Sequence, residues 1–152
     1  ITSYTGSAST VTIPRSVSGT AVTAIGRQAF MNNTAVTSVT MPSGITSIGL
    51  QAFSGCSSLS SVTMPSTLNS IGMAAFYGCT SLRSVSIPSG TQSIGDEAFA
   101  GCSELKTITI PDSVTSIADD AFDGCDGLTI VSSDGSAAHE FAVGKSINTR
   151  TA

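Results

Sequence analysis

The stretch "SIGLQAFSGCSSLSSVTMP", residues 47–65, decides the fold, because the chain repeats it almost unchanged. A step of 23 residues leads to "SIGMAAFYGCTSLRSVSIP", and the same step leads again to "SIGDEAFAGCSELKTITIP". Phenylalanine, cysteine and proline all keep this step, at Phe30, Phe53, Phe76, Phe99 and Phe122, at Cys56, Cys79, Cys102 and Cys125, and at Pro42, Pro65, Pro88 and Pro111. A fixed period of roughly 20 to 50 residues is typical of repeat architectures.

One unit, residues 59–81, predicts a short strand, a second extended piece and a turn of helix. Apolar positions alternate with Ser61 and Thr63, which indicates a strand with one apolar side that ends at Pro65. After Gly72, the segment "MAAFYGC" is expected to form about one helical turn. The inward positions are Leu59, Val62, Met64, Leu68, Ile71, Ala75, Phe76 and Cys79.

These inward positions are too few to form a core within one unit. Stacked in register, each unit buries them against the same residues of its neighbours, which predicts a solenoid. We expect the first strands to form one continuous parallel ladder at about 4.8 Å spacing, and the five phenylalanines to form a buried spine.

The whole chain, 1–152, is predicted to be a single solenoid domain. Residues 1–13 form an N-terminal cap and the first strand, with Tyr4 covering the first coil. Residues 14–127 hold five repeats of about 23 residues, and a longer step from Pro14 to Pro42 predicts a small loop in the first. Residues 128–152 supply the last strand and a C-terminal cap. In that cap Ser136 begins a helix and Gly144 stops it, and its apolar face is expected at Ala137, Ala138, Phe141 and Ala142.

The unit L-x-x-V-x-I-P-x-x-V-x-S-I-G-x-x-A-F-x-G-C-x-x, over Ala8 to Val131, resembles the BspA-like (Treponema-type) leucine-rich repeat. The resemblance implies a leucine-rich-repeat solenoid (α/β by tradition, short parallel strands plus helical turns) with right-handed coils in a curved stack. It also implies a bacterial-type cell-surface or secreted protein engaged in adhesion and protein binding, and it brings no catalytic signature. The departures from the pattern are Ala118 at a glycine position, Met31-Asn32 in place of Gly-Cys, and Thr91 at an apolar position.

Charge is sparse and unevenly distributed. The net charge is −4, and residues 1–95 contain no Asp or Glu at all. So few basic residues argue against a nucleic-acid partner. No apolar run is long enough for a membrane span, and the segment lacks a signal peptide of its own. The start at Ile1 indicates a mature or excised piece, so a cell-surface or secreted location stays open.

Residue clusters with possible chemistry have plainer interpretations. Side chains in adjacent coils stand about 5 Å apart, too far for a disulfide, and four sulfurs in a line cannot surround zinc, so we expect free, buried cysteines. The cluster Asp119, Asp120, Asp123 and Asp126 lacks the spacing of a calcium loop and is interpreted as a solvated acidic face. The only histidine, His139, has no nucleophile motif beside it. We therefore expect no enzyme activity, no cofactor and no metal.

The outward side of the first strands is the predicted binding surface. Its residues are small and hydroxyl-rich, and solenoids present extended surfaces that can vary without disturbing the core. The candidate ligand-binding residues are Thr40, Ser61, Thr63, Arg83, Ser84, Ser86, Lys106, Thr107 and Thr109. Proteins of the host extracellular matrix or of partner-cell surfaces are the expected partners, with glycans as a further possibility.

Two other functions fit the same surface. The chain could be a structural spacer or stalk repeat without a specific ligand, since β-branched and small polar residues suit any exposed strand. The regular T-x-T rows also allow ice- or crystal-surface binding, although serines and the cations Arg83 and Lys106 disturb a flat match. Retention by matrix proteins and thermal hysteresis would separate the three.

Overall fold

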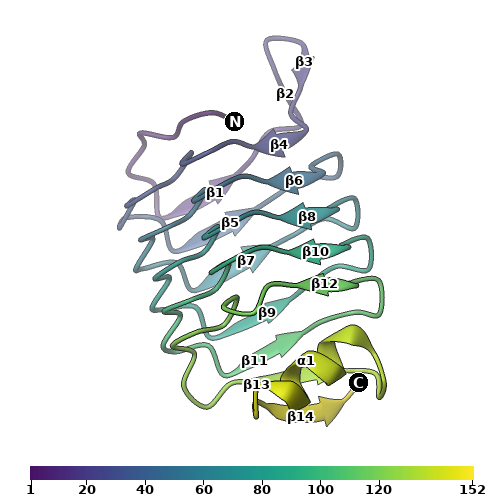
Figure 1. The fold of residues 1–152 in the computed structure, drawn as a ribbon. Helices are drawn as coiled ribbons and strands as arrows, with labels where there is room; N and C mark the ends of the chain where they lie inside the picture. Colours follow the sequence, from purple (N-terminus) through teal and green to yellow (C-terminus); the bar gives the residue numbers. More distant parts are fainter.

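The computed structural model describes residues 1–152, which form a stack of coils that wind in a right-handed sense (Figure 1). We number coils 1 to 5 by the phenylalanine each contains, from Phe30 to Phe122. The first strands of the coils form the strand ladder: β1 (Thr10–Thr12), β5 (Ser38–Thr40), β7 (Ser61–Thr63), β9 (Ser84–Ser86), β11 (Thr107–Thr109) and β13 (Thr129–Ser132). The predicted solenoid of stacked parallel strands is confirmed.

A second ladder runs down the opposite side of the coils. It is an unbroken parallel sheet made of β4 (Ala24–Ile25), β6 (Ser47–Ile48), β8 (Ser70–Ile71), β10 (Ser93–Ile94) and β12 (Ser116–Ile117). Like pairs with like in both ladders, for example Val39 with Val62 and Ile71 with Ile94. The 23-residue repeat therefore places the same side chain of every coil in one interior column.

The phenylalanine column is the clearest of these. The four ring pairs from Phe30 to Phe122 have centroids 4.8–5.6 Å apart and are tilted by only 3–16°. Tyr4 stacks on Phe30 at 4.8 Å, as predicted for the N-terminal cap. At the other end Phe141 meets Phe122 edge-on at 5.9 Å. The aromatic spine thus runs from one cap to the other.

The third side of each coil, which we call the turn face, consists of residues 26–34, 49–57, 72–80, 95–103 and 118–126. Its backbone differs from the helical turn that was predicted. It contains consecutive β-turns and no helical turn. In coil 3 the amides of Ala75, Tyr77 and Cys79 close turns at 3.1–3.2 Å, while those of Phe76 and Gly78 donate to coil 4 at 2.8 Å. A helix would consume every amide within its own coil. The alternation leaves half of them to bind the neighbouring coil.

Departures from the repeat are accommodated locally. Asn32 donates its amide to Ser54 as Gly55 does one coil later, so Asn32-Asn33, and not Met31-Asn32, occupy the Gly-Cys positions. The Asn33 side chain accepts from the amides of residues 35 and 36 and donates to Gly6 in the N-terminal cap at 3.0 Å. Thr91 is fully buried, but its hydroxyl donates to the Leu68 carbonyl at 3.1 Å, which satisfies it.

Ala118 changes the shape of the last coil. A Cβ at the equivalent Gly72 or Gly95 would come within 2.8–2.9 Å of the backbone of the preceding coil. In coil 5 the turns remain, for example from the Ala121 amide to Ala118 at 3.1 Å, but one bond between coils changes: Glu97, whose equivalents donate to a backbone carbonyl, donates to the Asp120 carboxylate at 3.0 Å. A methyl group at a position that fits only glycine accounts for this rearrangement.

Both ends of the stack are covered. The predicted loop of coil 1 is an antiparallel hairpin, β2 (Ser16–Val17) and β3 (Thr20–Ala21), and the amino group of Ile1 donates to Ala24 of β4. The predicted helix is α1 (Ala137–Gly144), capped by Ser136, although Ala137 is exposed and does not join its buried face. A final strand, β14 (Asn148–Thr151), pairs with β13 and was not predicted. No helix is long and apolar enough to cross a membrane.

Candidate binding face

The outward side of the strand ladder, which we call the strand face, holds the predicted binding residues. Thr40, Ser61, Thr63, Ser84 and Ser86 are exposed, while Thr107 and Thr109 of β11 are half-buried. The register brings them into rows, with Thr40 beside Thr63, Ser84 beside Thr107, and Ser86 beside Thr109. The alternation of the strands therefore directs hydroxyl groups to solvent and valine or isoleucine to the core.

These outward hydroxyl groups differ from those of Thr37 and Ser60, which directly precede β5 and β7. None of the seven serine and threonine side chains on the face makes a hydrogen bond within the chain, whereas the Thr37 hydroxyl donates to Ser9 at 3.0 Å and the Ser60 hydroxyl to Thr37 at 3.2 Å. Residues 37 and 60 hold successive coils together. The face itself keeps its donors and acceptors free for solvent or a partner.

The strand ladder is interrupted between coils 3 and 4, in contrast to the continuous ladder predicted. β7 pairs with β5 and β9 pairs with β11, but β7 and β9 are not paired. At other joints the residue after the strand donates to the next coil, as Met41 does to Thr63 at 3.0 Å, and Met64 lacks this bond. Val62 is partly exposed where Val39 is fully buried. We call this open joint the seam.

The two cations of the face are not equivalent. Arg83 is exposed beside the seam and makes neither an ion pair nor a side-chain hydrogen bond. Lys106 donates its ammonium to the Asp126 carbonyl at 2.7 Å and lies 3.4 Å from the Ser103 carbonyl. The Lys106 ammonium is thus engaged by backbone carbonyls of coils 4 and 5, and Arg83 is the only cation of the strand face without a hydrogen-bond partner.

The cysteines are free, as predicted, and three of the four are buried. Each thiol donates to the carbonyl of the phenylalanine one coil earlier at 3.0–3.2 Å. Burial raises the pKa of Cys56 and of Cys125 to about 11 and that of Cys102 to about 12. This bonding role was not predicted, because spacing alone does not show where a thiol points.

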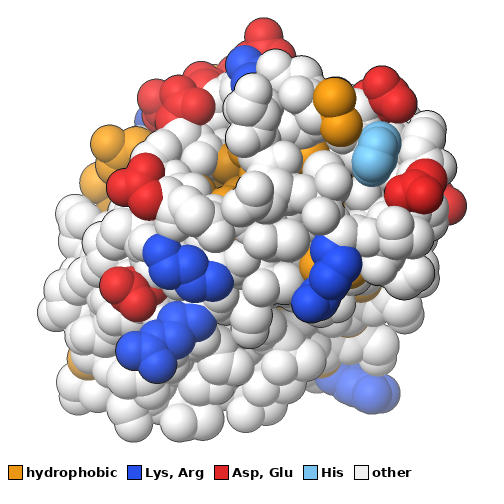
Figure 2. All heavy atoms as spheres, turned by 90° about the horizontal axis from the view of Figure 1, so that it is seen from below, with side chains coloured by type: hydrophobic (Ala, Val, Ile, Leu, Met, Phe, Trp, Pro, Cys, Tyr) orange, Lys and Arg blue, Asp and Glu red, His pale blue; other side chains and the backbone are white.

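Polar clusters outside the strand face make few contacts. Lys145 of the C-terminal cap lies 3.7 Å from the largely exposed carboxylate of Asp119, and His139 lies 3.9 Å from Asp134. No three His, Cys, Asp or Glu side chains gather as a metal site would require. Figure 2 shows the C-terminal end, where acidic side chains gather on the upper left and others lie on the right beside the histidine.

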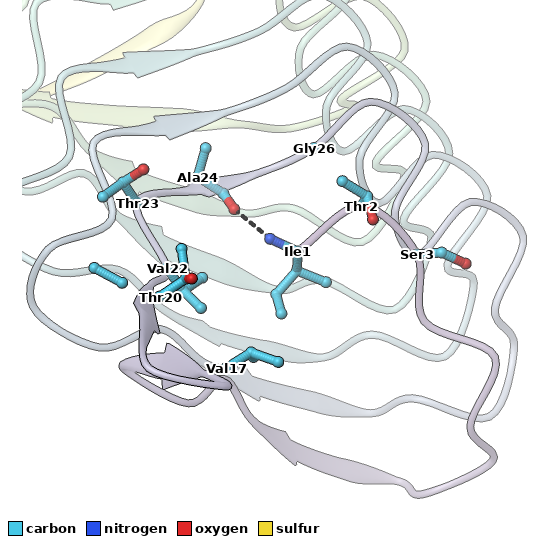
Figure 3. A pocket seen from close by; sticks show the side chains of 10 residues that line it. Ile1, Thr2, Ser3, Val17, Thr20, Val22, Thr23, Ala24 and Gly26 are labelled. Carbon is cyan, nitrogen blue, oxygen red and sulfur yellow. Dashed lines mark hydrogen bonds between the residues drawn. The ribbon is translucent and has the colours of Figure 1, made fainter.

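The largest hollow lies away from the strand face, at the N-terminal end. It measures about 500 Å³ and is formed by residues 1–3, the hairpin and β4. Ile1, Val17 and Val22 border it (Figure 3). Two smaller hollows, of about 210 and 180 Å³, lie beside the C-terminal cap. The strand face contains no enclosed cavity, so it suits a macromolecular surface better than a small ligand.

Known proteins share both the sequence pattern and the fold. The profile of the BspA type leucine rich repeat region matches residues 3–136 in six copies. A Treponema pallidum leucine rich repeat protein is 32% identical with a TM-score of 0.83, covering 86% of this chain and 61% of its own. A leucine-rich repeat protein from Bacteroides capillosus is 33% identical with a TM-score of 0.62, covering 68% and 77%.

A leucine rich cell surface protein from Faecalibacterium prausnitzii is 30% identical over 86% of this chain and 49% of its own, with a TM-score of 0.57. No functionally curated protein matches. The chain spans about three fifths of the Treponema structure. Leucine-rich repeats of this kind are protein-interaction or structural modules, typically non-catalytic and typical of bacterial surface or secreted proteins. The chain belongs to the BspA-type leucine-rich repeat family.

Proposed function

We propose that this chain is a non-catalytic adhesion module of a cell-surface or secreted protein, and that it binds host matrix or partner-cell surface proteins through its strand face. The observation that carries the proposal is the set of outward hydroxyl groups, exposed from Thr40 to Ser86 and half-buried at Thr107 and Thr109, that make no hydrogen bond within the chain. Surface groups that stabilise nothing locally are available to a partner.

The face favours binding of modest strength. It offers no exposed aromatic side chain, and Arg83 is its one free cation, whereas strong interface anchors are usually Trp, Tyr or Arg. Several copies acting together would raise the effective affinity without any new contact. We therefore expect weak binding by a single domain and strong retention on a dense surface.

The seam gives the partner a place to dock. Ser61 and Thr63 on one side and Ser84 and Ser86 on the other are exposed, and Val62 and Met64, which pack against the core, are partly exposed at the open joint. A contact at the seam engages the outward hydroxyl groups of two coils at once and covers the backbone of β7 and β9 where the two strands are not paired.

The test is biolayer interferometry with the immobilised protein and a panel of purified extracellular matrix proteins. The variant Ser61→Glu/Arg83→Glu/Ser84→Glu places three acidic groups around the seam and should weaken binding about tenfold or more, the factor that 1.4 kcal/mol represents. The control Ser66→Glu/Ser89→Glu places two acidic groups on exposed loops of the same coils and should bind as the wild type does.

Two results would overturn the proposal. Retention of no matrix protein by a dense wild-type surface would favour the spacer. Equal binding by the seam variant and the control variant would move the site elsewhere on the molecule.

A further inference from the structure

Exposed apolar side chains gather on the turn face, and none is on the strand face, while Val17 of the hairpin and Val143 of α1 are exposed singly at the two ends of the stack. Five such side chains are strongly exposed, and three of them, Met31, Met73 and Tyr77, lie on the turns of coils 1 and 3. Tyr77 is 46% and Met73 48% exposed, and Leu50 of coil 2 is partly exposed beside them. Exposed apolar groups that gather on one side of a soluble protein mark an interaction site.

Two parallel columns of side chains run down this face. Backbone hydrogen bonds align the coils, for example from the amide of Gly55 to Tyr77 and from that of Gly101 to Asp123. The first column reads Arg27, Leu50, Met73, Asp96 and Asp119, and the second reads Met31, Ser54, Tyr77, Ala100 and Asp123. Below coil 3 both columns become acidic, the first at Asp96 of coil 4 and the second at Asp123 of coil 5.

Tyr77 stands out from its own column. Its neighbours above and below, Ser54 and Ala100, are only 7% and 5% exposed. Its hydroxyl group makes no hydrogen bond within the chain, so the ring projects between two low positions with a free polar tip. A tyrosine of this kind is a typical interface anchor, and the methionines beside it adapt to varied surfaces.

The acidic half of the face identifies the partner. Asp96, Glu97 and Asp123 are exposed on coils 4 and 5, directly below the apolar residues. In Figure 2 the turns lie at the left, where acidic side chains and protruding apolar ones occupy the same margin. Such a surface repels nucleic acid and anionic membranes and attracts Lys and Arg.

We propose that a patch on the turn face is a second docking surface, separate from the strand face. This turn-face patch consists of Met31, Leu50, Met73, Tyr77, Asp96, Glu97 and Asp123. Its occupant is a protein segment that carries apolar side chains beside Lys or Arg. The apolar groups contact coils 2 and 3 around Tyr77, and the basic groups contact the carboxylates of coils 4 and 5. One chain could then hold two partners on two sides of the same coils.

The probe is a synthetic peptide of about ten residues, with two Trp in its first half and three Lys in its second. About six of these residues cover the surface, because an extended chain covers about 3.3 Å per residue and four coils span about 15–20 Å, and the others extend beyond it at the two ends. Nitrogen-15 NMR of the labelled protein should show shifted amides on the turns of coils 2 to 5 and unchanged amides in β7 and β9. Two control peptides, one with Ser in place of Trp and one with Glu in place of Lys, should shift neither the amides of the turns nor those of β7 and β9.

Variants then test each half of the surface. Met73→Ser/Tyr77→Ser should weaken peptide binding about tenfold, the effect of losing an interface anchor. Asp96→Lys/Asp123→Lys should weaken it by a similar factor and remove its sensitivity to salt. All four side chains are exposed, so an unchanged melting temperature is expected to show that each variant is folded.

The strand-face variant Ser61→Glu/Arg83→Glu/Ser84→Glu must bind the peptide as the wild type does, which separates this proposal from the adhesion proposal. The proposal is wrong if the peptide does not bind or if its shifts fall on the strand face. It is equally wrong if both turn-face variants bind with wild-type affinity.

Discussion

The joint between coils 3 and 4 is open on the strand face and closed on the other sides of the same two coils. β7 and β9 do not pair, yet β8 and β10 pair in register and the rings of Phe76 and Phe99 stack at 5.1 Å. The equivalent ring distance between coils 2 and 3, where both ladders are closed, is 5.2 Å. Opening the strand face therefore does not separate the interior columns.

This difference shows which interactions hold the stack together. The phenylalanine column, the second ladder and the amides of the turn face continue through the joint, so they are sufficient to keep the coils in contact. Burial of a whole aromatic side chain stabilises by about 1.5–3 kcal/mol, more than the roughly 1 kcal/mol net of a backbone hydrogen bond. The pairing of β7 with β9 can therefore be lost without separating the buried side chains of coils 3 and 4.

The largest effect is expected from breaking the closed side. Phe76 is fully buried between two stacked rings, and Phe76→Ala should cost about 3–5 kcal/mol because it leaves a cavity in mid-stack. Phe122→Ala, at the end of the column and 5% exposed, should cost less. Urea unfolding of both variants measures the difference, and an equal or smaller loss for Phe76→Ala would contradict the column as the main support.

Alkaline pH tests the same closed side through the cysteines. Burial raises the pKa of Cys102 to about 12, whereas the unfolded thiol titrates near its ordinary value of about 8.5. A raised folded pKa favours folding below the unfolded pKa, and this contribution is lost as the pH rises toward the folded value. Stability should therefore fall between about pH 8.5 and 12.

The matched variant is Cys102→Ser, whose hydroxyl can still donate to Phe76 but does not titrate. One unit of pKa shift corresponds to 1.36 kcal/mol, so the wild type should lose about 2 kcal/mol more than the variant between pH 7 and 10. Unfolding curves at both pH values give this difference. Parallel losses in the two proteins would mean that the Cys102 thiol is already ionised in the native state.

A smaller effect should separate the open joint from a closed one. Val39 and Val62 occupy equivalent positions in β5 and β7, but only Val39 is fully buried. Val39→Ala should cost about 2 kcal/mol and Val62→Ala about 1 kcal/mol, because the second removes less buried surface. Equal costs in urea unfolding would indicate that β7 is packed as tightly as β5.

The smallest effect is expected on the outside of the same strands. Thr63 is exposed and makes no side-chain hydrogen bond, so Thr63→Ala should change stability by less than about 0.5 kcal/mol. A scanning-calorimetry shift of several degrees would show that the outward hydroxyls stabilise the solenoid, and the argument for a free binding face would lose its basis.

The repeat in the sequence predicted the stack and the ring column, because a 23-residue period favours like-on-like stacking, and the helix signals at Ser136 and Gly144 predicted the capping helix. The helical turn predicted at 73–79 is wrong because the inward spacing of Ala75, Phe76 and Cys79 fits both a helix and consecutive β-turns, and the choice depends on amides that donate to the next coil. The seam could not be predicted from the strands, since β5 and β7 have the same residues, Ser-Val-Thr, and only their neighbours differ.

The candidate site was predicted in part. Alternation within each strand identified the outward hydroxyls, whereas the engagement of Lys106 with Asp126 depends on a loop 20 residues away. The turn-face patch was not predicted for a similar reason, because Met73 and Tyr77 gain their neighbours from the turns of adjacent coils and not from their own turn.

Hydrogen exchange followed by NMR tests the central claim, that coils 3 and 4 are open on one side and closed on the other. The amide of Met64 should exchange much faster than those of Met41 and Ile87, which donate to the next coil at 3.0 and 2.9 Å. The amide of Gly95, which donates to Ile71 across the same joint at 2.9 Å, should stay protected. Protection of Met64 equal to that of Met41 and Ile87 would contradict the account.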